Sequence, residues 1–182
     1  MRLLILTLSG LLIVACKVQA QSPAVRFETM IPGLVNAPVQ RPSGEGAGAG
    51  FVAELVVLSG GSATVLTPVT TFKVSSALDA LYVNPVDVPI PGGSPGQQVT
   101  LAFRVYPSEA GSYNGAIAAR FLHGQSAPIT VTLRALDQAA IELVGLQGFT
   151  LLVPEPSVVA AAILGMGVLA IRLRNRSIHS NA

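Results

Sequence analysis

Side chains with special chemistry are scarce in this sequence. Its 182 residues include one cysteine, two histidines and no tryptophan. Cys16 lies in an N-terminal apolar segment, so a chain that loses this segment has no thiol and no disulfide. Zinc-type sites need several His or Cys ligands, and Asp79, Asn84 and Asp87 lack the Asp-x-Asp-x-Asp repeat of a calcium loop. We therefore expect no metal and no cofactor.

Candidate catalytic groups are equally few. His179 falls in the C-terminal tail, which leaves His123 as the one histidine for a Ser-His-Asp arrangement. The residues after it, Gly124-Gln125-Ser126-Ala127, lack the second glycine of a nucleophile elbow, so His123 is interpreted as a loop residue. Paired carboxylates for glycoside hydrolysis can come from distant strands, and spacing leaves that alternative open. We predict a protein that is not an enzyme and assign no catalytic residue.

Charge is also low and unevenly placed. Charged residues make up 11% of the chain, and the formal net charge is +2. The excess of basic residues lies in the two terminal segments, whereas residues 21–152 contain six basic and eight acidic side chains. These are Arg26, Arg41, Lys73, Arg104, Arg120 and Arg134 against Glu28, Glu45, Glu54, Asp79, Asp87, Glu109, Asp137 and Glu142. The basic pI near 9.0 is thus no argument for nucleic acid, and none is expected as a partner.

Residues 1–20 are typical of a secretory signal peptide. A basic residue precedes an apolar run, and Val18-Gln19-Ala20 before Gln21 is a small-residue cleavage site. We expect export through the secretion translocon and cleavage by signal peptidase between Ala20 and Gln21. The stretch Ile13-Val14-Ala15-Cys16 also resembles the lipobox of bacterial lipoproteins, in which Cys16 would be lipidated. That alternative stays open, although a lipid anchor would duplicate the C-terminal apolar segment.

The C-terminus carries the most informative pattern. Val153-Pro154-Glu155-Pro156-Ser157 is followed by an apolar segment, 158–171, and then by Arg172, Arg174 and Arg176. A helix over this segment spans roughly 21 Å, against a hydrocarbon core of about 30 Å. Arginines at its end predict a cytoplasmic C-terminus and an exported body. The two prolines keep the residues before the helix extended, so the Pro-Glu-Pro motif is expected to be accessible at the membrane surface.

This order of motif, apolar helix and arginine cluster resembles the PEP-CTERM sorting signal of Gram-negative bacteria that make extracellular polysaccharide. The resemblance implies that exosortase, a membrane enzyme, recognises the tail and cuts it near the motif. It divides the chain into a signal peptide (1–20), a body (21–152), a sorting signal (153–176) and a cytoplasmic tail (177–182). The protein is then expected in the inner membrane during transit and afterwards on the outer surface or in the extracellular matrix. A permanent single-span membrane anchor is the alternative.

The body reads as short strands between Gly/Pro turns. Alternating apolar residues predict strands over 99–105 and 129–133, and 51–58 reads as a strand rich in β-branched and aromatic residues. Pro85 suggests that the strand over 81–88 lies at a sheet edge, and 112–121 is compatible with one or two turns of helix. Residues 36–50 are expected to form a loop with little reason to be ordered. We predict an all-β, antiparallel β-sandwich, and the body also loosely resembles uncharacterised ectodomains that precede PEP-CTERM tails.

Carbohydrate binding is a second functional hypothesis. Sugar sites commonly present aromatic rings, and Tyr106 and Tyr113 lie close together in sequence beside a polar, glycine-containing turn. They are candidate sugar contacts, with exopolysaccharide as the partner. The alternative is that both tyrosines simply close a turn over the core.

Overall fold

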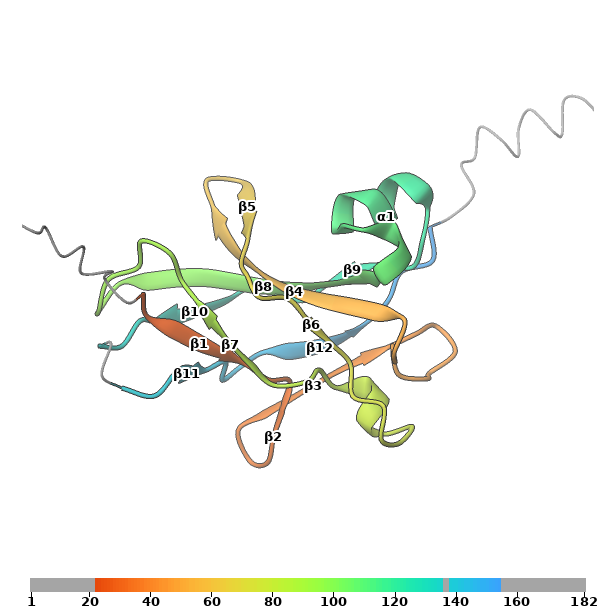
Figure 1. The fold of residues 1–182 in the computed structure, drawn as a ribbon, viewed down its shortest axis with the longest axis horizontal. Coiled ribbons are helices and arrows are strands. Elements are labelled where there is room, and N and C mark those ends of the chain that lie inside the picture. Colours follow the sequence, from red (N-terminus) through yellow and green to blue (C-terminus); the bar gives the residue numbers. More distant parts are fainter. Residues whose placement is uncertain (1–21, 136–137, 155–182) are drawn as a thin grey trace, which may run out of the picture.

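The computed structural model of the chain describes residues 22–135 and 138–154 (Figure 1). These residues are mostly β-strand. The strands are β1 (Ala24–Phe27), β2 (Met30–Ile31), β3 (Val35–Gln40), β4 (Phe51–Ser59), β5 (Ser62–Val65), β6 (Thr70–Thr71), β7 (Val86–Pro89), β8 (Gln98–Pro107), β9 (Gly124–Gln125), β10 (Ile129–Thr132), β11 (Ile141–Glu142) and β12 (Gln147–Thr150). The helices are the 3₁₀ turns η1 (Asp79–Leu81) and η2 (Ser108–Ala110) and the α-helix α1 (Tyr113–Ala119). The all-β prediction is confirmed.

Three sheets build the body. The largest has the order β10-β8-β4-β5, with β6 also paired to β4 and β9 to β8, and the other two have the orders β11-β1-β7 and β12-β3-β2. In Figure 1, β8 and β4 run across one layer, while β1, β11, β12 and β3 lie in the layer beneath it. Helix α1 lies on the outer side of the β8 layer.

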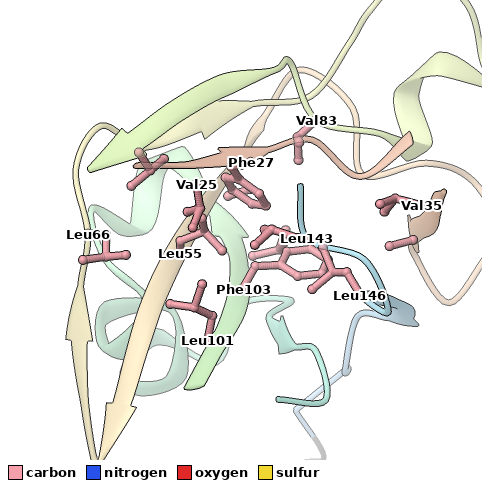
Figure 2. Close-up of a cluster of buried hydrophobic side chains, with 14 of the residues drawn as sticks. Val25, Phe27, Val35, Leu55, Leu66, Val83, Leu101, Phe103, Leu143 and Leu146 are labelled. Carbon is pink, nitrogen blue, oxygen red and sulfur yellow. The ribbon is translucent and has the colours of Figure 1, made fainter. Parts of the chain in front are cut away.

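The core lies between these layers because alternate residues of each strand point inward. Leu55 on β4 and Leu101 and Phe103 on β8 are fully buried in one hydrophobic cluster, which also contains Phe27 of β1. The ring of Phe103 packs against Phe27 with 5.7 Å between centroids and against Phe149 with 5.0 Å. Figure 2 shows side chains from both layers meeting around Phe103. Burial of each such side chain contributes about 1.5–3 kcal/mol.

The pairing pattern departs from the antiparallel prediction in two places. Strand β11 pairs parallel with β1, and β12 pairs parallel with β3. In each case a strand from the end of the body joins one from its beginning. Parallel neighbours need a long connection between them, and nearly the whole body provides it here. Local sequence patterns contain no information about such a pairing.

The prediction of a poorly ordered loop over residues 36–50 is wrong. Residues 36–40 belong to β3, and the turn that follows is held by hydrogen bonds from Arg41 N–H to Glu45 O (2.7 Å) and from Gly44 N–H to Arg41 O (2.9 Å). The side chain of Arg41 donates to Ala47 O at 2.6 Å. The glycines therefore form a compact turn that leads into β4.

Most of the other local predictions are confirmed. The expected strands over 51–58, 99–105 and 129–133 appear as β4, β8 and β10, and the short helix appears as α1. The strand predicted over 81–88 forms only in part, because Leu81 ends the 3₁₀ turn η1 and β7 begins after Pro85. Strand β7 does lie at the edge of its sheet. None of the described helices is long and apolar enough to cross a membrane. The predicted transmembrane helix, 158–171, lies outside the described residues.

Candidate functional site

The end of the described chain is where the predicted sorting motif begins. Strand β12 ends at Thr150, and Leu151 N–H then donates to Gln40 O at 2.7 Å. Leu152 forms an isolated antiparallel bridge with His123, its N–H donating to His123 O at 2.7 Å. Backbone pairing therefore continues up to the residue before Val153. We call residues 151–154 the chain exit.

Side-chain burial changes abruptly along the chain exit. Leu151 is buried, whereas the exposed fractions of Leu152 and Val153 are 62% and 60%. Val153 of the predicted motif is thus exposed directly after the paired backbone ends, and Pro154 is half-buried. Glu155, Pro156 and Ser157 lie outside the described residues, as do Arg172, Arg174, Arg176, Cys16 and the Ala20–Gln21 cleavage site.

A cluster of polar and aromatic side chains lies beside the exit, on the outer side of β4 and β8. Glu54 and Arg104 stand directly opposite each other in the β4–β8 register. The guanidinium of Arg104 donates from Nε to Gln125 Oε1 at 2.7 Å and lies 4.7 Å from the centre of the Tyr113 ring. Tyr106 completes the cluster. We call Glu54, Arg104, Tyr106, Tyr113, His123 and Gln125 the outer cluster.

Helix α1 holds Tyr113 in this position. Ser112 caps the helix, its Oγ accepting a hydrogen bond from Gly115 N–H at 3.0 Å. Gly115 has no room for a side chain, since a Cβ there would overlap the carbonyl of Ala110. Tyr113 therefore starts the helix facing β8, and Ala116 is buried beneath it. A left-handed residue, Arg120 (φ 59°), ends the helix.

His123 connects the cluster to the chain exit. Its ring meets the Tyr113 ring edge to face with 5.6 Å between centroids. Its Nδ1 lies 2.8 Å from Phe121 O, while its backbone pairs with Leu152. The interpretation of His123 as a simple loop residue misses this role in joining α1 to the end of the body.

Burial shifts the ionisation of the cluster. Glu54 is only 4% exposed, and desolvation raises the pKa of its carboxyl, although a hydrogen bond from Tyr106 and the charge of Arg104 act in the opposite direction. Desolvation, together with the charge and hydrogen bond of Glu54, raises the pKa of Tyr106 to about 12. Burial also raises the pKa of Tyr113.

Comparison of the chain with protein-family models, curated proteins and solved structures finds no match in any of the three. Within the described part of the chain, no three His, Cys, Asp or Glu side chains gather as a metal-ligand set.

The two tyrosines predicted as sugar contacts lie in the same cluster but differ in access. Tyr106 is only 6% exposed, so its ring offers little surface to a ligand. Tyr113 is half-buried between Arg104 and His123. Sequence reasoning placed both near one turn but missed Glu54, Arg104 and Gln125. The signal for Glu54 and Arg104 was their place at outward positions of two strands whose inward positions are apolar.

Proposed function

We propose that this protein is a secreted, non-enzymatic β-sandwich whose C-terminal tail is recognised and cut by exosortase, so that the body is delivered to the cell surface or the extracellular polysaccharide matrix. The observation that carries the proposal is the chain exit. Backbone pairing ends at Leu152, so the motif starts with no intervening linker, beside an apolar segment that the sequence places four residues after Pro154.

The β-sandwich assignment is part of this proposal. It is supported by two layers of strands with a continuous hydrophobic cluster between them, to which β4 and β8 each contribute every second residue. The residues of this core all belong to the body. In this proposal the tail acts only as a sorting signal.

The sorting proposal is tested by replacing Pro154, Glu155 and Pro156 with alanine in the native host. We expect the uncut precursor to accumulate in the inner membrane and surface release to be lost, because exosortase no longer finds its motif. Mass spectrometry of the mature C-terminus and cell fractionation measure this. Pro95→Ala, in an exposed turn, is the matched control and should be processed normally. Unchanged processing of the triple variant would refute the sorting proposal and favour a permanent anchor.

Carbohydrate binding remains a second candidate function, and a different face supports it. A shallow hollow of about 410 Å³ lies along β3 and β12 and is lined without any charged side chain. Its polar side chains are Asn36, Gln40, Gln147 and Thr150. Tyr82 donates to Asn36 Oδ1 at 2.9 Å, which leaves the amide N–H groups of Asn36 for another partner. Uncharged amides both donate and accept, as sugar hydroxyls require.

Co-sedimentation of the purified protein with exopolysaccharide from the native host tests this second candidate. Gln147→Ala should weaken binding if the hollow is the site, whereas Tyr113→Ala should weaken it if the outer cluster is. Absence of binding by the unmodified protein would exclude both sites.

A further inference from the structure

Exposed aliphatic side chains lie at the point where the chain leaves the body and on the helix next to it. Leu152 and Val153 are more than half exposed, and Ile117 on α1 is 47% exposed. Helix α1 is held at this end of the body because Tyr113 packs on His123 and His123 pairs with Leu152. Figure 1 shows α1 beside the end of the described chain. We call Ile117, Leu152 and Val153 the exit patch.

The length of chain after the exit limits how far this patch can lie from the membrane. The apolar segment starts at Val158, four residues after Pro154. A fully extended chain covers at most about 3.6 Å per residue, so this link reaches roughly 14 Å. The headgroup and interfacial layer on one side of a bilayer is about 5–8 Å thick, so the exit lies at most about 6–9 Å outside this layer. A body tethered this closely has to turn its exit end toward the lipid.

We propose that the exit patch rests in the lipid headgroup layer before the tail is cut, so that the body is docked on the membrane by one defined face. This inference depends on the proposed insertion of the segment 158–171. Exposed aliphatic side chains gain by entering the interface. Glu109 of η2 and Arg120 at the end of α1 are both exposed beside the patch and have opposite charges. Docking therefore needs no anionic lipid.

The absence of tryptophan gives a direct test. Ile117→Trp creates a single fluorophore in the exit patch. Leu34→Trp is the matched control, because Leu34 is similarly exposed, at 50%, but lies away from the exit. It is two residues before Asn36, which pairs with Gln147 at the end of β12 farthest from the exit. The signal-cleaved precursor, with its tail uncut, is placed in phosphatidylcholine vesicles whose acyl chains carry bromine, which quenches tryptophan. We expect a clear loss and blue shift of fluorescence for Ile117→Trp and neither for Leu34→Trp.

Flotation of the vesicles separates the two proposals. Protein that does not float with the vesicles would overturn both the insertion of the tail and the docking of the patch. Protein that floats with equal quenching at the two positions, or with no quenching at position 117, would overturn the docking alone. Leu152→Trp is a second reporter in the patch, because the backbone of Leu152 is paired while its side chain is exposed. It should be quenched like Ile117→Trp.

Discussion

At the scale of single residues, the outer cluster is organised around a carboxylate that the fold makes costly to ionise. Glu54 is buried on the outer side of β4, and the Tyr106 hydroxyl and Arg104, across the strand pair, both act to lower its raised pKa. A buried charge needs each hydrogen bond it receives, because the alternative is an uncompensated desolvation cost. Tyr106 is therefore expected to stabilise the folded protein.

Removing the Tyr106 hydroxyl should expose this dependence. We expect Tyr106→Phe to lower the free energy of unfolding at pH 7 by about 1–3 kcal/mol, the usual cost of leaving a buried polar group without its partner. Urea unfolding followed by circular dichroism measures it. Tyr82→Phe is the matched control, because the Tyr82 hydroxyl bonds an exposed amide and its loss should cost less.

The same variant should show a defined pH dependence. The pKa of Glu54 is raised in the folded state, so the folded protein holds its proton more tightly than the unfolded chain, and stability falls as the pH rises from the ordinary glutamate pKa through the raised one. Tyr106→Phe removes an interaction that lowers this pKa, so its deficit should grow from pH 4 to pH 7. An equal deficit at both pH values would contradict the role of Glu54.

At the scale of elements, the sequence predicted strands well where their reasons are local. Alternation of apolar residues predicted β8 and β10, and a run of β-branched and aromatic residues predicted β4. Strand β3 was missed because Pro38 argues against a paired strand. Strand β3 can contain this proline because its partner β12, far along the chain, adapts to it. The register of β12 shifts between Gln147 and Phe149, opposite Pro38. Gly148 packs on the proline there, and a Cβ would overlap it.

The candidate site likewise contains some contacts that local sequence predicts and others that it does not. The approach of Tyr106 and Tyr113 follows from a short turn and was predictable. The meeting of Glu54 with Arg104 depends on the register of β4 against β8, and that of His123 with Leu152 joins residues from different parts of the chain. Register is set by which face is buried, and a single sequence shows the faces but does not show which strands are neighbours. The sorting role of the motif stays a prediction from the sequence, and the residues that surround the chain exit could not be predicted from it.

At the scale of the whole molecule, the positions of the two ends of the described chain determine where the body could be tethered to a membrane. Figure 1 shows β1 starting at one end of the long axis and the chain exit at the other. With signal peptidase cleavage after Ala20, the body has one tether, at the exit. A lipid on Cys16 would add a second tether eight residues before Ala24, and cutting the tail would then fail to release the body.

This contrast leads to a prediction about Cys16. We expect Cys16→Ser to leave the mature N-terminus at Gln21 and surface release unchanged, because the cysteine departs with the signal peptide. Mass spectrometry of the N-terminus and fractionation of the native host measure both, with sensitivity to globomycin, the inhibitor of lipoprotein signal peptidase, as an independent readout. A lipid-modified N-terminus at residue 16, or membrane retention that disappears in Cys16→Ser, would establish the lipoprotein alternative. In that case the body would be held at both ends of its long axis, and the tail would no longer decide where it goes.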